Sequence, residues 1–413
     1  MFLRSHHLSP VPYPTSLVEE IDSILDFYRK IANNDPNLLR LIIPSEEVWR
    51  FFVDGVQQAN GSWAAFEYRE PGYLPALYRA YQTLFDFSVN IDIHYIFRLH
   101  ALATSGVDNT NYSQDDRAIT GSFRDNERGV FFRLGIWKNQ PNVSEDGLYE
   151  YFERNSLLTT ITMNIVGISI VVDDSLLTFL RNGMEAVQSG MTNMDIVNAL
   201  WRSIEVFIPK EVFKSRLALA KARLAPLLKL LGETKNNREV ATVIYSTMIK
   251  NRFIRDGIEF RLASDQPIDT FSILAVEMKK LINDYQQGIN QAKTSLEKLH
   301  VIATFIQSCE QLHPFLDANC RTFCMLLANH LLMRHGFLPA IFDDPNRFDA
   351  FSRHELVAEM INGMKNTVEL IKKGMLYGVK TMDTFMRRDR DYFYNVVAIE
   401  EQGRDRPCKR IKY

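Results

Sequence analysis

The sequence has 413 residues, of which 46% are hydrophobic and 24% are charged, and its formal net charge is −2. This composition is typical of a globular protein that buries a large core, and the length favours two or three lobes. A net charge near zero gives no electrostatic reason to expect a nucleic-acid partner. No apolar run reaches the roughly 18 residues that a membrane span needs, so none is expected.

The cysteines and the first residues indicate a reducing compartment. The four cysteines (Cys309, Cys320, Cys324 and Cys408) form no Cys-x-x-Cys pair, which argues against a disulfide framework. The first residues lack the basic-then-apolar pattern of a secretory signal peptide. We therefore expect a cytoplasmic site of action.

Helical periodicity of apolar residues dominates most of the chain. Apolar residues recur three and four positions apart in several stretches, which predicts amphipathic helices over 16–31, 74–87, 92–102 and 217–231. Turn-forming clusters separate them, at Asn33 to Pro36, Gly55 to Gly61, Glu70 to Gly72 and Gly106 to Ser113. The most apolar stretch, 161–172, is interpreted as a buried element. The predicted fold is mainly α, with helical lobes packed against each other.

Two short segments depart from helical spacing. Residues 123–134 and 253–262 each alternate apolar and charged residues around a turn, and this alternation predicts a β-hairpin in each. They are the two candidates for a short hairpin beside the functional site, and two unrelated surface hairpins are the alternative.

The run from His313 to Arg321 (His-Pro-Phe-Leu-Asp-Ala-Asn-Cys-Arg) concentrates the chemistry of the chain. A histidine with an ordinary pKa of about 6.5 can take a proton from a hydroxyl. The Asp317 carboxylate suits Mg²⁺ that bridges phosphates. An amide and a guanidinium follow and can contact phosphoryl oxygens. Because an apolar helix-like stretch follows directly, its N-terminus adds backbone N–H groups, and the run predicts a phosphate-handling site.

This run resembles the signature of the Fic (filamentation induced by cyclic AMP) family, His-x-Phe-x-(Asp/Glu)-(Gly/Ala)-Asn-Gly-Arg-x-x-Arg. The resemblance implies a helical core in which one helix presents the histidine and the following loop binds the donor phosphates. The implied catalytic residues are His313, Asp317, Asn319 and Arg321, and Asp317 is also the implied metal ligand. The implied donor phosphate-binding residues are Ala318, Asn319, Cys320 and Arg321.

Two positions depart from the family pattern. Cys320 replaces a glycine, and Cys324 stands where the family has a second arginine that holds the terminal phosphate of ATP. The loss weakens the case for ATP. Three outcomes stay open: a donor without a gamma phosphate, such as CDP-choline; ATP held by a substitute residue; or a site that no longer turns over. Mg²⁺ is the implied cofactor in the first two.

The resemblance also suggests a division of the chain. A flap upstream of the motif docks the target protein by strand addition in the family, and we assign it to the later hairpin, residues Arg255, Asp256, Gly257, Ile258, Glu259 and Phe260. The earlier segment is the rival, because Gly121-Ser122-Phe123-Arg124 resembles the lead-in to the flap. The predicted domains are a helical region over 1–90, a Fic-like domain over 91–345 with a helical insertion around 150–250, and a helical region with a basic tail over 346–413.

The predicted function is a Fic-like, adenylyltransferase-type enzyme. It would move a nucleotidyl or phosphocholine-like group from a nucleotide donor to a Ser, Thr or Tyr hydroxyl of a target protein, and the resemblance also suggests a bacterial effector acting in a host cell. The alternative is a catalytically silent module of the same fold that binds a partner protein.

Overall fold

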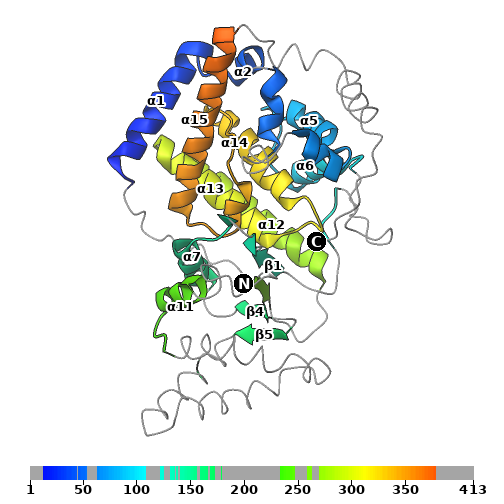
Figure 1. Ribbon diagram of the computed structural model, residues 1–413, viewed down its shortest axis with the longest axis vertical. Coiled ribbons are helices and arrows are strands. Elements are labelled where there is room, and N and C mark those ends of the chain that lie inside the picture. The colour runs from blue at the N-terminus through cyan, green and yellow to red at the C-terminus, as the bar shows by residue number, and fades with distance from the viewer. Residues whose placement is uncertain are drawn as a thin grey trace. The chain divides into compact units, whose positions relative to one another are not determined.

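The computed structural model describes residues 13–43, 45–53, 63–107, 121–124, 131–134, 136–137, 140–155, 159–165, 168–172, 178, 233–246, 258–262 and 269–377. The described chain is mainly helical, as predicted, with two small sheets (Figure 1). It divides into two compact units that interleave along the sequence. The first unit comprises Met1–Pro14, Ser122–Asn319 and Asn346–Ala358, and the second comprises Thr15–Gly121, Cys320–Pro345 and Glu359–Tyr413.

The second unit is helical in its described part. It contains α1 (Thr15–Ala32), α2 (Pro36–Ile42), the short helix η1 (Ser45–Phe51), α4 (Trp63–Arg69), α5 (Tyr73–Thr83), α6 (Ile93–Thr104), the π-helix η5 (Arg321–Leu327), α14 (Ala328–Arg334) and most of α15 (Arg353–Tyr377). Asn33 and Asn34 end α1 with positive φ angles of 51° and 57°, a backbone conformation that asparagine tolerates. Asp35 then caps α2 by accepting a hydrogen bond from the Asn37 backbone N–H.

Three of the four predicted helices lie among the described residues. The helices α1, α5 and α6 confirm the predictions over 16–31, 74–87 and 92–102, although α5 ends at Thr83. The Asp92 carboxylate begins α6 by accepting from the Tyr95 backbone N–H. The predicted helix over 217–231 lies outside the described residues.

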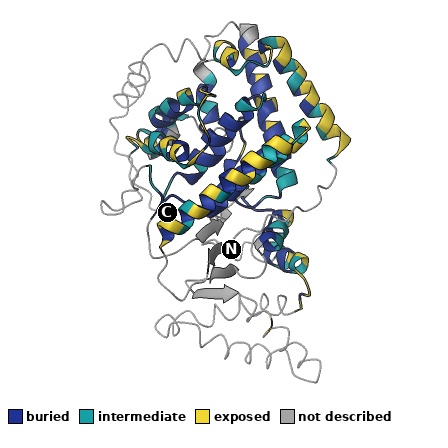
Figure 2. Ribbon diagram, turned by 180° about the vertical axis from the view of Figure 1, so that it is seen from behind, coloured by how far each residue is buried: buried dark blue, intermediate teal, exposed yellow. Residues whose placement is uncertain are grey.

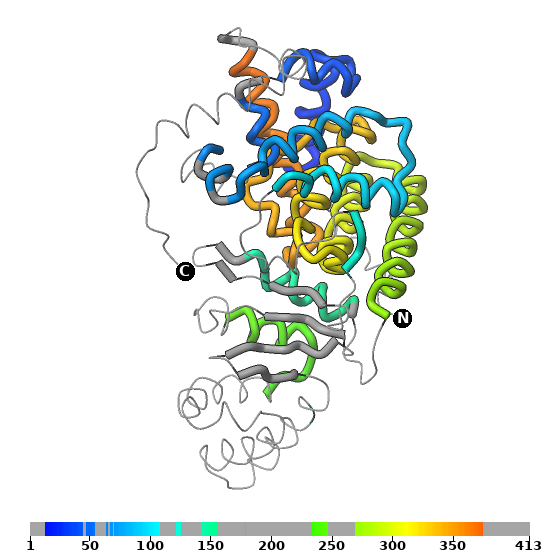
Figure 3. Tube along the Cα trace, turned by 90° about the vertical axis from the view of Figure 1, so that its right-hand side faces the viewer, coloured from blue at the N-terminus to red at the C-terminus, as the bar shows by residue number. Residues whose placement is uncertain are grey.

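The first unit is built on the long helices α12 (Thr270–Gln291) and α13 (Ser295–Leu312). They run antiparallel, because contacts pair early residues of one with late residues of the other: Met278 with Cys309, and Tyr285 with Phe305, whose rings stack at 4.7 Å. Figure 2 shows α12 with buried residues along one side and exposed residues along the other, and Figure 3 follows the chain through both helices. This amphipathic pattern lets α12 cover α13.

A four-stranded antiparallel sheet also belongs to the first unit. Its order is β1 (Phe131–Leu134), β6 (Ile258–Leu262), β4 (Thr159–Ile165), β5 (Ile168–Val172), while β2 (Ile136–Trp137) pairs with β3 (Gln140–Pro141). The apolar stretch 161–172 is therefore a hairpin, β4 with β5. The predicted insertion around 150–250 is consequently not entirely helical.

The sheet corrects the prediction of two separate hairpins. Strand β1 comes from the earlier segment and β6 from the later one, and they pair with each other, Phe131 opposite Arg261 and Leu134 opposite Ile258. Strand β4 occupies the other edge of β6. The later segment therefore supplies an interior strand. The sequence did not predict this pairing, because strands that are far apart in the chain leave no local pattern that identifies their partners.

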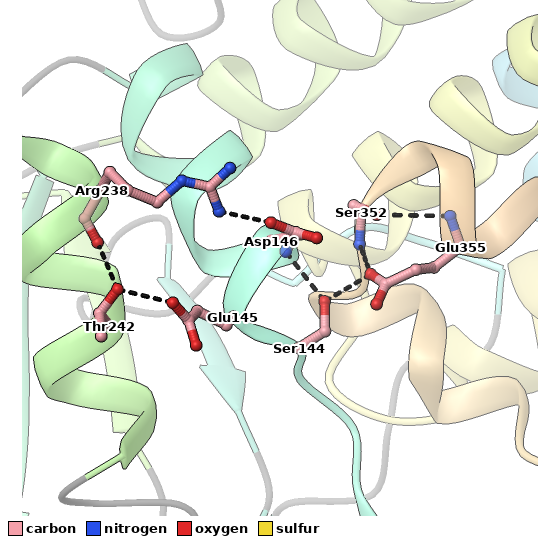
Figure 4. A network of polar contacts seen from close by, with 8 residues as sticks. Ser144, Glu145, Asp146, Arg238, Thr242, Ser352 and Glu355 are labelled. Atoms are coloured by element: carbon pink, nitrogen blue, oxygen red, sulfur yellow. Dashed lines mark hydrogen bonds and ion pairs between the residues drawn. The ribbon is translucent and has the colours of Figure 1, made fainter. Parts of the chain in front are cut away.

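A polar network joins α7 (Glu145–Asn155), α11 (Asn237–Ile244) and the start of α15 within the first unit (Figure 4). Thr242 donates to Glu145 at 2.6 Å, and Ser144 donates to Glu355 at 2.5 Å. Arg238 pairs with Asp146. The network fixes α7 beside the first turn of α15.

Among the described residues, no helix combines the length and the apolar character needed to cross a membrane.

Candidate active site

Helix α13 places His313 at its end. The helix begins with a capping box, in which Thr294 and Glu297 satisfy each other's backbone N–H groups. At the other end, His313 is the C-cap and takes the left-handed conformation (φ 46°, ψ 55°). Its backbone N–H donates to the carbonyls of Cys309 and Glu310 at 3.3 and 3.0 Å. The chain therefore leaves the helix abruptly at the histidine, which starts the loop.

A short strap, residues 121–124, holds the first residues of this loop. The Arg124 backbone N–H donates to the Pro314 carbonyl, and the Arg124 Nε donates to the His313 carbonyl, both at 2.8 Å. The rings of Phe123 and Phe315 lie 5.6 Å apart and both are buried. Phe315 is thus the core anchor of the loop. The strap restrains the histidine from the backbone side.

The surroundings of His313 keep its imidazole neutral. Burial, together with the nearby Arg124, lowers its pKa to about 4, although Asp317 and the Glu310 backbone carbonyl act in the opposite direction. The side chain is nevertheless 26% exposed. An imidazole that is neutral at pH 7 and still reachable can accept a proton from a hydroxyl.

The next residues shape a tight turn. Ala318 has a φ of 61°, a left-handed conformation that costs an alanine about 1 kcal/mol relative to glycine. The Asn319 side chain closes the turn, because its Oδ1 accepts from the Phe315 N–H and its Nδ2 donates to the Phe315 carbonyl, both at 2.9 Å. Asn319 is 3% exposed. Its amide therefore holds the loop together, and only its second N–H is left for the predicted phosphate contact.

The motif passes into the second unit at Cys320. This residue has φ −56° and ψ −43°, an ordinary right-handed conformation that a cysteine adopts without strain. The left-handed positions of the loop are His313 and Ala318. Cys324 is fully buried in η5, so its thiol offers no surface to a phosphate.

Arg321 is held by its own neighbours in the second unit. Its Nη2 lies 2.5 Å from a carboxylate oxygen of Glu70, and its guanidinium stacks over the Tyr73 ring at 4.9 Å. The Tyr73 hydroxyl in turn donates to the Phe52 carbonyl at 2.7 Å. The guanidinium side chain is 12% exposed. A phosphate that binds Arg321 directly has to compete with the Glu70 carboxylate.

Sequence reasoning missed two residues that the structure connects to the motif. Arg124 was noted as part of the resemblance to a flap lead-in, and that resemblance was the available indication of its role. Glu70 lies in a Glu-Pro-Gly turn that predicted a chain reversal and nothing of its partner Arg321. Both partnerships join residues far apart in the chain, so spacing within the motif carries no trace of them.

The predicted docking flap is only partly described. Arg255, Asp256 and Gly257 lie outside the described residues, whereas Ile258, Glu259 and Phe260 belong to β6. Because β6 is paired on both edges, Ile258, Glu259 and Phe260 offer no open edge to a target strand, and docking by the rest of the flap stays a prediction. Strand β1 is at the edge of the described sheet, and it follows the strap that holds the loop.

The structure tests whether the residues fit the implied Mg²⁺. Within the described residues, no three His, Cys, Asp or Glu side chains gather as a metal site. Asp317 is partly exposed in the loop. Mg²⁺ in phosphate-transfer sites is commonly held by one or two carboxylates together with the substrate phosphates, so a single loop carboxylate fits this mode of binding.

A curated bacterial protein is similar to most of this chain. No family model matches the chain. Over 355 residues, which is 83% of this chain, the sequence is 29% identical to Phosphocholine transferase AnkX of Legionella pneumophila subsp. pneumophila (strain Philadelphia 1). The match covers 30% of that protein, so the chain spans about a third of the length of the relative it matches.

Proposed function

We propose that the chain is a Fic-like transferase that moves phosphocholine from a diphosphate-linked nucleotide donor, such as CDP-choline, to a Ser, Thr or Tyr hydroxyl of a target protein. The observation that carries the proposal is the neutral, partly exposed imidazole of His313, held at the end of α13 by the Arg124 strap. A general base of this kind is what transfer to a hydroxyl requires. The motif around it supplies the phosphate-binding chemistry.

In the proposed reaction His313 takes the proton of the target hydroxyl. The hydroxyl oxygen then forms a bond to the phosphorus that carries choline, and the bond from that phosphorus to the bridging oxygen of the donor breaks. Cytidine monophosphate leaves with the electron pair. The imidazolium that forms lies near Asp317, whose carboxylate stabilises it. Asn319 keeps the turn closed while this happens, through its two bonds to Phe315.

The proposal includes Mg²⁺ at Asp317. Bound there, the metal would offset negative charge on the donor phosphates. Arg321 would contact a phosphate once Glu70 releases it, a role that rests on its place in the motif. The helix that starts at this point adds backbone N–H groups that favour an anion.

Two observations favour phosphocholine over adenylyl as the group transferred. The relative described above is named a phosphocholine transferase. In addition, Cys324 is buried and uncharged, so this position supplies no cation for a gamma phosphate. A diphosphate donor has no gamma phosphate to hold. We extend the proposal to action as a bacterial effector on a protein of a host cell, supported by the bacterial origin of that relative.

The experiment incubates the purified chain with a eukaryotic cell lysate and CDP-choline or ATP, each with Mg²⁺. Mass spectrometry then searches for proteins that gain phosphocholine or adenosine monophosphate. We expect phosphocholine on protein hydroxyls, reduced by at least about 10²-fold in His313→Ala. The matched control is His94→Ala, since His94 is exposed on α6. Transfer by His313→Ala near the wild-type rate would contradict the role of His313, and adenylyl transfer alone would contradict the choice of donor.

The alternative function is a protein-binding module in which the site is silent. Three observations favour it: Glu70 holds Arg321, Phe315 holds the Asn319 amide, and Cys324 is buried. Calorimetry with CDP-choline and Mg²⁺ separates the two functions. A silent module binds no donor at millimolar concentrations, whereas a transferase binds it and loses the Mg²⁺ dependence in Asp317→Ala.

A further inference from the structure

A second group of chemically active side chains lies in the first unit, outside the His313 loop. They come from the N-terminal segment, α7, α13 and the start of α15, and we call them the buried arginine cluster: Tyr13, Glu150, Arg154, His300, Arg353 and His354. The Tyr13 hydroxyl lies 2.8 Å from the His300 Nδ1, and the Tyr13 ring stacks on His354 at 4.3 Å. The cluster is distinct from the motif, because His300 and His313 are thirteen residues apart on α13, about 20 Å along a helix.

Two guanidinium groups of this cluster have a buried nitrogen left over, Arg154 being a buried residue and Arg353 a half-buried one. Arg154 is 3% exposed, and its Nε and Nη2 donate to the Glu150 carbonyl and to Gln307 Oε1 at 3.3 and 3.0 Å. Among the residues that the structure describes, its Nη1 has no hydrogen-bond partner, and the buried Nε of Arg353 has none either. In the described part of the chain, neither guanidinium makes an ion pair with a carboxylate. Buried native donors are usually satisfied, so these two need an explanation.

The cluster also carries more positive than negative charge. Two guanidinium groups stand against the single carboxylate of Glu150, which accepts the Arg353 backbone N–H at 3.1 Å. Burial lowers the pKa of His300 to about 4, with help from Arg353, so this imidazole is neutral at pH 7. Burial, with a smaller contribution from Arg353, likewise lowers the pKa of Arg154 to about 9. A buried positive charge without a counter-charge is costly.

We infer that the buried arginine cluster binds a phosphate group. The two unsatisfied donors come from different elements, α7 and the first residue of α15, whose relative position the network of Figure 4 fixes. A tetrahedral phosphate accepts hydrogen bonds from several directions, whereas a planar carboxylate pairs best with one edge of one guanidinium. The phosphate adds the missing negative charge. It can come from free inorganic phosphate or from a phosphomonoester on another molecule.

The first experiment titrates the full chain with inorganic phosphate by calorimetry, at pH 7 and at an ionic strength held constant with chloride. We expect saturable binding, weakened at least tenfold in Arg154→Met and in Arg353→Met. Binding should be unchanged in Lys279→Met, a matched loss of a positive charge from an exposed position of α12 in the same unit. Binding that persists in both cluster variants would overturn the inference.

Thermal unfolding keeps the test decisive if a variant folds poorly. Phosphate should raise the melting temperature of the wild type beyond the effect of chloride at equal ionic strength, and this rise should be lost in Arg154→Met. Because that substitution removes an uncompensated charge, its melting temperature without phosphate should be no lower than that of the wild type. A wild type that shows neither a phosphate-dependent rise nor calorimetric binding at millimolar concentrations would refute the site.

The source of the phosphate is tested with a third set of ligands. Binding of O-phosphoserine as tightly as inorganic phosphate supports a phosphomonoester ligand, and binding of inorganic phosphate alone supports the free ion. Acetate is the carboxylate control. If acetate binds as tightly as phosphate, the cluster recognises small anions in general and the assignment to phosphate is wrong.

Discussion

Burial at a single residue determines how the proposed reaction responds to pH. The pKa of His313 is lowered to about 4, so the free imidazole stays neutral and able to accept a proton down to about pH 5. We therefore expect kcat/KM to be nearly constant from pH 7 to pH 5, whereas a histidine with the ordinary pKa of about 6.5 loses most of its activity over this range.

The control for this profile is Arg124→Met. It removes a charge that lowers the pKa of His313 and a hydrogen bond to the His313 carbonyl. The acid limb should move to higher pH and kcat should fall. A wild-type profile that already declines near pH 6.5 would contradict the proposal that the buried His313 is the essential base.

The Glu70 carboxylate is expected to compete with the donor for Arg321. Replacing it in Glu70→Gln keeps the size of the side chain and removes the charge that lies 2.5 Å from the Arg321 Nη2. Donor affinity measured by calorimetry should rise about tenfold, which corresponds to roughly one charge-assisted hydrogen bond. Glu47→Gln, which disrupts the neighbouring Arg50 pair, is the matched control and should leave affinity unchanged. Weaker binding in a folded Glu70→Gln protein would mean that Glu70 supports the site rather than blocking it.

At the scale of single residues, the sequence predicted which residues gather in the loop better than what each does. The sequence predicted that His313 and Asp317 belong to one loop, because they lie only four positions apart in the chain. The role of Asn319 depends on the direction in which its amide points, which is toward the Phe315 backbone. The position of the Arg321 guanidinium depends on its hydrogen bond to Glu70, which lies 251 positions away in the chain. Orientation and long-range pairing come from the folded chain, so spacing within a motif does not encode them.

At the scale of elements, one glycine decides how closely α7 approaches the segment before α15. A Cβ at Gly147 would lie 1.8 Å from the Ala350 carbonyl oxygen and 2.6 Å from the backbone of Phe351. Backbone atoms cannot move aside as a side chain can. We expect Gly147→Ala to lower the free energy of unfolding by about 1–3 kcal/mol or more, measured by urea denaturation.

Gly288→Ala is the matched control on α12. A Cβ there meets only the Val301 side chain, at 3.2 Å, and alanine favours a helix interior over glycine by about 1 kcal/mol. The substitution should be neutral or slightly stabilising. Equal losses of stability in the two variants would contradict the close approach at Gly147.

The same contrast between local and distant partners explains which elements were predictable. The helices α1, α5 and α6 carry their apolar positions three and four apart, so each could be predicted from its own residues. The strands were harder, because β1 pairs with β6 across more than a hundred residues. Alternation predicted extended chain in both segments, and it gave no information about which strand each would join.

At the scale of the whole molecule, buried histidines in both units should make the fold sensitive to acid. Burial lowers the pKa of His300, His313 and His330 to about 4 each. His330 is fully buried in the second unit, where its Nδ1 lies 2.9 Å from the Leu84 carbonyl and its ring stacks on Phe87. In the unfolded chain each histidine has a pKa of about 6.5. Between these two values, the unfolded state binds more protons than the folded state.

Above about pH 6.5, the contribution of these histidines to the free energy of unfolding should therefore not change with pH. As the pH decreases from 6.5 toward 4, the free energy of unfolding should fall. The difference between the two pKa values corresponds to about 3 kcal/mol for each histidine, at 1.36 kcal/mol per pH unit. Urea denaturation between pH 7.5 and pH 4.5 measures the slope. His330→Phe, which keeps an aromatic ring beside Phe87 and Tyr95, should make it shallower, whereas His94→Ala, at an exposed position of α6, should not. An unchanged slope in His330→Phe would mean that His330 does not contribute to the acid sensitivity, because its charge state would then be the same in the folded and unfolded chain.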